Sequence, residues 1–405
     1  MTDLHLVVVT GPRLVADPAL LRQIVAAECD ALGLPGRLEA AADGEALGKV
    51  LLDGGRDDTR AIVALPGADP AGRSMLTLPG SHASRTVWYD VTDTGPAEVA
   101  AGSVHLFGRG IQGLTWAIRH AVHRLRHPAR RISYGPHPDQ WADLRLPPDR
   151  DARPQPVLPP DHNGRPLPVL PPDHDAGPLP VAVLLHGGYW RSIWGADLMD
   201  ALSIDLAGRG YAAWNLEYRR PDRHGWDATT ADVAAGFAAL ATAAREHPLD
   251  LGRTAVLGHS AGGQLALRLA ADVAGIAPAV SLAVSLAGVL DLGEGALRRI
   301  SSGAVPAALG GTPDEIPEVY AAADPLTRLP LGVPQLIVQG LDDDLDLVDF
   351  NRRYAARGQR TGDELVHVEQ PGDHFAVIDP ASDIWRATTA QMGRRLPVRR
   401  SVGGM

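Results

Sequence analysis

The pentapeptide Gly258–Gly262, with the sequence GHSAG, has the composition and surroundings of a turn that presents a nucleophilic serine. It follows the apolar run Thr254–Leu257 and precedes a helical run that begins at Ala261. In a G-x-S-x-G turn the glycines allow a sharp passage from strand to helix, which exposes the serine Oγ. The positive end of the helix dipole then lies beside the hydroxyl. We therefore expect Ser260 to be a catalytic nucleophile.

A serine hydroxyl is a poor nucleophile without a general base, and the base needs a carboxylate that fixes its tautomer. The apolar run Pro334–Gly340 leads into three aspartates, and the run Glu364–Gln370 leads to His374. Both side-chain types thus follow strands, at the edge where open α/β sheets bind their ligands. With Ser260, they occur in the order Ser, Asp, His that is typical of nucleophile-turn hydrolases. His374 is therefore the expected base.

The carboxylate that orients His374 comes from the acidic run after the strand. The third position after the strand-ending Gly340 is the usual place for this residue, which favours Asp343. Asp342 and Asp344 remain the alternatives, because all three lie in the same turn.

The segment His186-Gly187-Gly188-Tyr189-Trp190 ends another apolar run and could bind a negatively charged oxygen. Glycines allow backbone N–H groups to approach a substrate carbonyl, and we expect Gly187, Gly188 and Ala261 to form an oxyanion hole. Two interpretations stay open for Tyr189 and Trp190. They either line the substrate pocket or pack beneath the loop.

These residues need a scaffold of alternating strands and helices, and the chain has that pattern. The expected strands after residue 128 are Trp141–Leu146, Pro180–Leu185, Tyr211–Tyr218, Thr254–Leu257, Ser281–Leu292, Pro334–Gly340 and Glu364–Gln370. The expected helices are Met199–Gly208, Thr229–His247 and a helix from Ala261. The pattern predicts an α/β domain over residues 129–397, followed by a flexible tail at 398–405.

Six motifs of this region together resemble α/β-hydrolase esterases of the kynurenine formamidase and bifunctional feruloyl/acetyl-xylan esterase-like (BD-FAE-like) type. They are HGGYWR, WNLEYRR, GHSAGGQLAL, LAGVLDL, GLDDDLDLV and GDHFAVIDP, in this order. The resemblance implies an α/β-hydrolase fold and an activity on acetyl esters, other carboxylic esters or aryl formamides. It supports the same nucleophile, base and acid.

A twelve-residue phrase occurs three times in residues 146–181, beginning each time with Leu-Pro-Pro-Asp. Each copy contains several prolines, which cannot donate ladder hydrogen bonds, so the repeat does not predict a solenoid. The resemblance needs only one copy as a turn between two strands. We interpret the other two as a tolerated loop expansion, with a proline-rich docking ligand as the alternative.

The region 1–128 has its own alternation of strands and helices. Runs at 4–9, 61–67 and 85–91 predict strands, and Pro18–Leu32 and Ile111–Arg126 predict helices. The segments TGPRL, LPGA and GRGIQGLTWAIRHAV resemble type II 3-dehydroquinate dehydratase, which implies a flavodoxin-like, parallel-sheet domain.

This resemblance does not extend to the catalytic residues of that family. The loop with its catalytic Arg and Tyr is missing, Leu65 replaces its Asn, and Trp88 and Asp90 replace its Glu and His. We therefore expect no dehydratase activity. The domain either forms homo-oligomers or acts as a binding module.

Composition limits the remaining classes of function. A net charge of −10 over 405 residues disfavours nucleic acid as a partner. Cys29 is the only cysteine, so no disulfide is expected, and its Ala-rich surroundings predict a core residue. The longest apolar run, Val280–Leu290, is too short to span a membrane. We expect a cytoplasmic protein without a cofactor or a metal.

The favoured function is hydrolysis of a small carboxylic ester by Ser260, Asp343 and His374. Cleavage of a formamide or another amide, or acyl transfer to an acceptor other than water, would use the same residues and stays an alternative.

Overall fold

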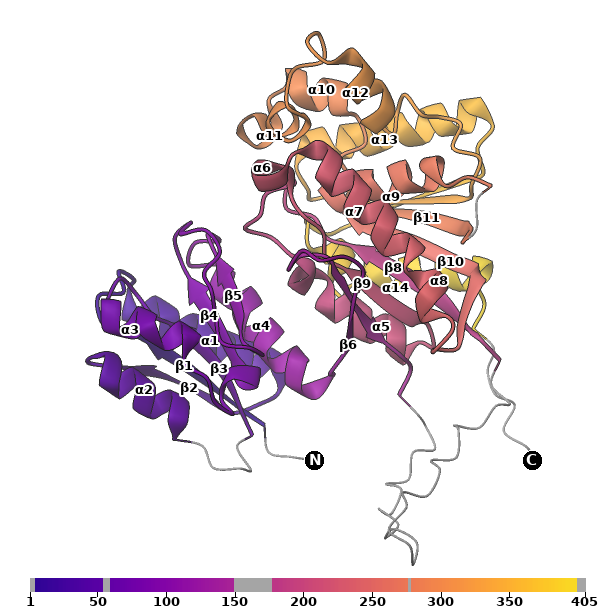
Figure 1. Cartoon of the computed structure of the whole chain (residues 1–405). Helices are drawn as coiled ribbons and strands as arrows, with labels where there is room; N and C mark the ends of the chain where they lie inside the picture. Colours follow the sequence, from indigo (N-terminus) through magenta and orange to yellow (C-terminus); the bar gives the residue numbers. More distant parts are fainter. Residues whose placement is uncertain (1–3, 54–58, 149–176, 276–277, 399–405) are drawn as a thin grey trace, which may run out of the picture. The chain divides into compact units, whose positions relative to one another are not determined.

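The computed structural model describes residues 4–53, 59–148, 177–275 and 278–398. The chain forms two compact units (Figure 1). The first comprises Met1–Arg130 and Trp190–Asp200, and the second comprises Arg131–Tyr189 and Ala201–Met405. Most of the twelve-residue repeat and of the terminal tail lies outside the described residues, so the interpretations of both stay predictions.

The first unit has a five-stranded parallel sheet in the order β2-β1-β3-β4-β5. Its strands are β1 (His5–Thr10), β2 (Gly36–Ala40), β3 (Arg60–Leu65), β4 (Thr86–Asp90) and β5 (Val104–Phe107). This order is that of flavodoxin-like folds, in which ligands bind near the point between β1 and β3 where the direction of winding reverses. The unit is therefore flavodoxin-like.

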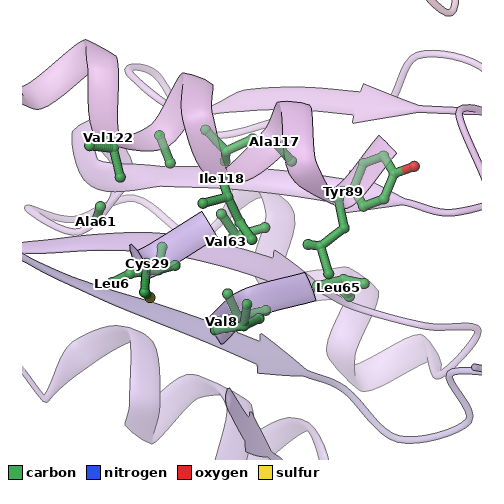
Figure 2. Close-up of a cluster of buried hydrophobic side chains, with 14 of the residues drawn as sticks. Leu6, Val8, Cys29, Ala61, Val63, Leu65, Tyr89, Ala117, Ile118 and Val122 are labelled. Atoms are coloured by element: carbon green, nitrogen blue, oxygen red, sulfur yellow. The ribbon is translucent and has the colours of Figure 1, made fainter. Parts of the chain in front are cut away.

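Helices cover both faces of this sheet. They are α1 (Pro18–Leu32), α2 (Gly44–Leu52), α3 (Pro70–Ser74) and α4 (Gly113–Arg126), with the 3₁₀ turns η1 (Met75–Thr77) and η2 (Ala83–Arg85). Side chains of α1 and α4 pack with β1, β3 and β4 in one buried cluster, part of which Figure 2 shows. Cys29 belongs to this cluster, which confirms it as a core residue. Leu65 and Trp88 are buried as well.

The second unit has an eight-stranded sheet in the order β13-β12-β11-β10-β8-β9-β7-β6. Its strands are β6 (Arg130–Ser133), β7 (Trp141–Arg145), β8 (Leu179–Leu185), β9 (Ala212–Leu216), β10 (Leu249–His259), β11 (Val280–Leu286), β12 (Gln335–Gly340) and β13 (Leu365–Gln370). Strands β8 to β13 pair in parallel, whereas β7 runs antiparallel to β9. The central strands β8, β11 and β12 and residues 254–259 of β10 are almost completely buried because helices flank the sheet.

The main helices of this unit follow the strands in alternation. They are α5 (Asp200–Gly208), α6 (Pro221–His224), α7 (Trp226–Ala238), α8 (Leu240–Ala243), α9 (Ala261–Asp272), α10 (Leu292–Leu297), α11 (Ile300–Leu309), α12 (Pro317–Ala323), α13 (Leu345–Thr361) and α14 (Asp383–Arg395), with the 3₁₀ turn η4 (Ala376–Ile378). The 3₁₀ turn η3 (Ala196–Met199) lies in the segment that belongs to the first unit. The prediction of a single helix over Thr229–His247 was wrong, because this stretch forms α7 and α8. The chain breaks at Ala239, whose N–H bonds both Ala235 O and Phe237 O and so tightens the end of α7.

None of the helices in the described ranges combines the length and the hydrophobicity that a membrane crossing requires.

Candidate active site

Ser260 occupies a sharp turn between β10 and α9. Its backbone angles are φ 55° and ψ −119°, a region that non-glycine residues rarely adopt. Such a conformation costs on the order of 1–3 kcal/mol and persists only where the surroundings impose it. Here the Ser260 N–H donates to Leu286 O at 2.9 Å, and Ser260 O accepts from the N–H of Val289 at 3.2 Å. The ends of β10 and β11 thus hold the strained turn.

The glycines of the turn are required by close backbone packing. A Cβ added to Gly258 would lie 1.8 Å from Gly262 O, and one added to Gly262 would lie 2.2 Å from Leu185 O. Strand β10, helix α9 and the end of β8 therefore approach one another more closely than any side chain would allow.

His374 and Asp343 come together at the ends of β13 and β12. His374 Nδ1 lies 2.9 Å from Asp343 Oδ2, which also accepts a hydrogen bond from Gln339 Nε2 at 2.9 Å. Burial opposes ionisation of Asp343, but the hydrogen bonds from His374 and Gln339 outweigh it and lower the pKa of this carboxyl. An ionised Asp343 fixes the proton of His374 on Nδ1, which leaves Nε2 free to act as a base.

The neighbouring aspartates have other structural contacts. Asp342 Oδ2 accepts from the Gly372 N–H at 2.9 Å and so ties the loop after β12 to the loop that bears His374. Asp344 caps α13 by accepting from the Asp346 N–H at 2.8 Å. Of the three carboxylates, Asp343 is thus the one whose hydrogen bond to His374 the structure contains.

His259, which precedes the serine, is a contact of the site that sequence reasoning missed. Its Nε2 lies 3.0 Å from His374 O, and the centres of the two rings are 4.6 Å apart. Burial, followed by the nearby charge of His374, lowers the pKa of His259 to about 3. His259 is thus neutral at ordinary pH and donates to the backbone of His374 without adding a second positive charge. Its position within GHSAG was the only signal in the sequence.

The loop after β8 approaches Ser260 through Gly187. A Cβ added to Gly187 would lie 2.7 Å from His259 O and 2.9 Å from Ser260 Cβ. Gly188, Tyr189 and Trp190 then have φ values of 108°, 50° and 57°. Three successive residues with positive φ make this a strained loop, because only the glycine adopts such angles readily. Ala261, the third expected oxyanion donor, is the first residue of α9 and is fully buried.

The two aromatic residues of the loop differ in their surroundings. Tyr189 is half-buried and ends a segment of the second unit. Trp190 is 1% exposed and belongs to the first unit. Substrate contact by Tyr189 and Trp190 stays a prediction.

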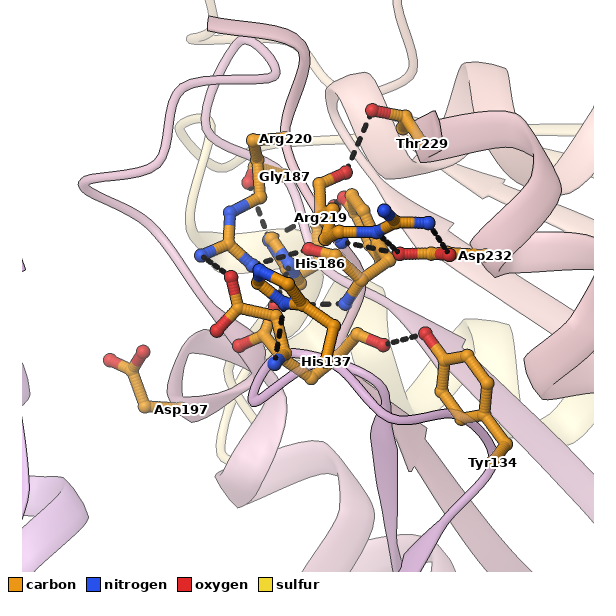
Figure 3. A network of polar contacts seen from close by, with 12 residues as sticks. Tyr134, His137, His186, Gly187, Asp197, Arg219, Arg220, Thr229 and Asp232 are labelled. Atoms are coloured by element: carbon orange, nitrogen blue, oxygen red, sulfur yellow. Dashed lines mark hydrogen bonds and ion pairs between the residues drawn. The ribbon is translucent and has the colours of Figure 1, made fainter. Parts of the chain in front are cut away.

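A network of polar contacts surrounds His186, the residue before Gly187 (Figure 3). His186 Nε2 is 3.1 Å from Glu217 Oε1, and the Tyr218 hydroxyl donates to His186 O at 2.6 Å. Arg220 forms ion pairs with Glu217 and, at 3.3 Å, with Asp139. His186 is fully buried, so this network fixes the backbone that leads into Gly187. The motif WNLEYRR contains three of these residues, but their contacts could not be predicted from it.

No group of three or more His, Cys, Asp or Glu side chains within the described residues is arranged to hold a metal ion.

Comparison with known proteins identifies the fold of the second unit. The family model described as BD-FAE matches residues 167–352, which include Ser260 and Asp343 but not His374. No curated protein sequence matches the chain.

Three solved structures illustrate the structural likeness. Esterase B from Lactobacillus rhamnosis, with a C4-C4 SN3 tributyrin phosphonate, is 16% identical at a TM-score of 0.53, covering 70% of this chain and 91% of the esterase. A thermophilic esterase from the Planctomycetes species Thermogutta terrifontis is 20% identical at a TM-score of 0.50, covering 68% and 95%. A bifunctional GH43-CE protein of Bacteroides eggerthii is 16% identical at a TM-score of 0.51, covering 65% of this chain and only 35% of that protein. The second unit therefore has an α/β-hydrolase fold, as the sequence predicted.

Proposed function

We propose that the second unit is a serine hydrolase that cleaves a small carboxylic ester. The observation that carries this proposal is the 2.9 Å contact between His374 Nδ1 and Oδ2 of the half-buried Asp343, at the same end of the sheet as the strained Ser260 turn. The BD-FAE match and the esterase names of the structural neighbours support an ester as the substrate.

Each residue has a defined role in the proposed reaction. His374 Nε2 takes the proton of Ser260 as Oγ attacks the ester carbonyl, and Asp343 stabilises the imidazolium that forms. N–H groups of Gly187, Gly188 and Ala261 stabilise the oxyanion, where the loss of one donor typically costs ~10²–10³ in rate. His374 returns the proton to the leaving alcohol. In the second half of the reaction His374 takes a proton from water, which attacks the acyl-enzyme, and then returns that proton to Ser260 Oγ as the acid is released.

The serine that the proposal requires can be tested by replacement. Ser260→Ala is expected to lower kcat on an activated acetyl ester by ~10⁴–10⁶, because triad residues act as a unit. The control is Ser281→Ala near the start of β11, where the hydroxyl donates to Gly252 O at 2.9 Å. The control should retain the parent rate. Equal loss in both variants, or no loss in Ser260→Ala, would refute the proposed nucleophile.

A panel of substrates separates the ester from its alternatives. The parent protein should hydrolyse short acyl esters faster than N-formylkynurenine, and added alcohol should not divert the acyl group from water. A preference for the formamide would assign an arylformamidase or amidase, and diversion of the product would assign an acyltransferase.

For the first unit we propose a non-catalytic role as an oligomerisation or binding module. The support is that Leu65 and Trp88 are core residues and that Asp90 is engaged in a bidentate ion pair with Arg73. None of these side chains is free to act on dehydroquinate. We expect no dehydratase activity and a mass above that of the monomer in light scattering. Turnover of dehydroquinate would contradict the proposal.

A further inference from the structure

The sheet of the first unit has an open edge at strand β2. This strand (Gly36–Ala40) is the outermost one, and within the described residues it pairs with β1 alone. An open edge is a template for another strand, and proteins commonly protect it with proline, lysine or a bulge. The sequence of β2, GRLEA, contains neither proline nor lysine, and its register with β1 is continuous. The edge is therefore able to accept a further strand.

The hydrogen bonds to β1 determine which backbone groups of β2 point outward. The residues just before and after the strand both bond β1, Pro35 through its C=O at 2.9 Å and Ala41 through its N–H at 2.8 Å. Along a parallel ladder every second residue directs its N–H and C=O to the same neighbour, so the odd-numbered residues between these two also face β1. The N–H and C=O groups of Gly36, Leu38 and Ala40 therefore point away from the sheet.

The side chains of β2 alternate between the two faces of the sheet. Leu38 packs against the buried cluster that contains side chains of α1 and β1. Arg37 and Glu39 therefore lie on the opposite face, where they form an ion pair with each other and are 50% and 33% exposed. The edge thus has one charge of each sign, placed symmetrically about Leu38.

Resting on the proposed role of the first unit, we propose that β2 pairs in antiparallel orientation with β2 of a second copy of this chain, about a two-fold axis at Leu38. The two five-stranded sheets then form one continuous sheet. Leu38 faces Leu38 of the second copy in the central hydrogen-bonded pair, and Gly36 faces Ala40 in the pair on either side. Residues in such pairs exchange two hydrogen bonds, so every outward-facing backbone group of β2 is satisfied.

The backbone and the charges select the same register. In the proposed register Arg37 lies opposite Glu39 of the second copy, in a non-hydrogen-bonded pair, where side chains approach most closely. A shift of two residues in one direction sets Arg37 against its own counterpart, and a shift in the other direction does the same to Glu39. Like charges directly opposite each other are destabilising. Either shift also removes one hydrogen-bonded pair, so the alternatives are weaker on both grounds.

The side of the edge that faces α1 provides an apolar surface for this contact. A hollow between α1 and β2 is lined by the apolar Val25, Ala26 and Leu38 and by the exposed, charged Arg22 and Asp30. Leu38 of the second copy would lie next to this hollow, because directly opposite residues of an antiparallel pair share a face of the sheet. An apolar centre surrounded by charged residues is typical of protein interfaces. The hollow therefore adds apolar contact area to the backbone hydrogen bonds.

Charge reversal in the full chain tests the pairing. Glu39→Arg sets two arginines opposite each other across the two-fold axis, and Arg37→Glu sets two glutamates opposite each other. Light scattering should give the mass of one chain for each variant, at a concentration at which the parent has the mass of two. An equimolar mixture of the two variants should regain the mass of two chains, because every arginine then meets a glutamate. The ion pair within each strand stays broken in this mixture, so recovery reports the contact between chains.

A matched control reverses a carboxylate on the edge strand of the other sheet. Glu369 lies on β13, which is the outermost strand there, and its side chain is 24% exposed and pairs with Arg352 at 2.7 Å. Glu369→Arg should keep the mass of the parent. Ala40→Pro tests the backbone contacts without a change of charge. It removes an outward N–H that the ladder with β1 does not use, so the variant should fold and have the mass of one chain.

Three results would overturn the inference: a monomeric parent, a parent dimer whose mass neither charge reversal changes, or two variants that stay monomeric when mixed. The second result would leave the proposed oligomerisation role in place through another surface. Turnover of dehydroquinate would instead contradict the proposed role itself, so the two failures are distinguishable.

Discussion

Replacement of Asp343 tests whether this carboxylate orients His374 or only adds negative charge to the loop after β12. Asp343→Asn keeps the size of the side chain but favours the wrong tautomer of His374, so kcat should fall by ~10⁴. Asp342→Asn is the matched control, because Asp342 bonds the Gly372 N–H and not the imidazole. The two variants are compared in kcat on an acetyl ester. A severe loss in Asp342→Asn with a mild one in Asp343→Asn would move the acid by one residue.

His259 offers a second test at this scale, because it bonds the backbone of His374 rather than its ring. His259→Leu removes the donor to His374 O, and a hydrogen bond of this kind contributes ~1 kcal/mol, which is roughly a factor of 5 in rate. His259→Gln retains an N–H donor and should recover part of that factor. Both are measured by kcat across pH. Since His259 stays neutral in the parent, neither variant should remove an ionisation from the pH profile between 5 and 9. The loss of one would show that His259 itself titrates there.

The strand-to-helix turn is the element on which the site depends, and Gly258 is its most constrained position. Gly258→Ala would place a methyl group 1.8 Å from Gly262 O, so the backbone must move. We expect the free energy of unfolding to fall by ~1–3 kcal/mol. Gly208→Ala at the end of α5 has no atom within 4 Å of the added carbon and serves as the control. It should be neutral or slightly stabilising. Thermal unfolding compares them, and equal melting temperatures would contradict the close packing of the turn.

Elements with strong local patterns were predictable from the sequence. The run Pro18–Leu32 has a proline at its start, an aspartate cap and a glycine after its end, and it forms α1 with these bounds. Strand β2 was missed because its side chains are mostly exposed at the sheet edge and show no apolar alternation. The break at Ala239 was missed because an Ala-rich run favours helix throughout, and only the hydrogen bonds of the folded chain end α7 there.

Only those residues of the site that belong to recognisable motifs could be predicted from the sequence. Ser260, Asp343 and His374 follow recognisable strands, whereas the contact of Glu217 with His186 depends on how β8 and β9 pair. The assignment of Trp190–Asp200 to the first unit had no local signal. Residues adjacent in one motif, Tyr189 and Trp190, belong to different units.

At the scale of the whole molecule, buried carboxylates make the second unit sensitive to pH. Asp324 is 3% exposed, and burial together with the nearby Asp291 raises its pKa to about 7. Its protonated form thus stabilises the folded state. This contribution is complete below the ordinary Asp value of about 4 and is lost as pH rises through 7.

Asp324→Asn tests this pH dependence because the amide does not ionise. Between pH 5 and 8 the parent should lose stability relative to the variant, by up to ~1.4 kcal/mol per pH unit. The measurement is the free energy of urea unfolding, followed at the transition of the second unit. A difference between parent and variant that stays constant with pH would contradict the raised pKa.

The central claim, that Ser260 is an activated nucleophile, is tested most directly by the mass of the Ser260 peptide after treatment with a fluorophosphonate. Such reagents form a bond with a serine only when a base removes its proton and an oxyanion hole receives the phosphoryl oxygen. We expect one phosphonyl group per chain, located on Ser260, with labelling abolished in Ser260→Ala and strongly slowed in Asp343→Asn. An unlabelled Ser260 in a folded protein that still hydrolyses the acetyl ester would contradict the claim.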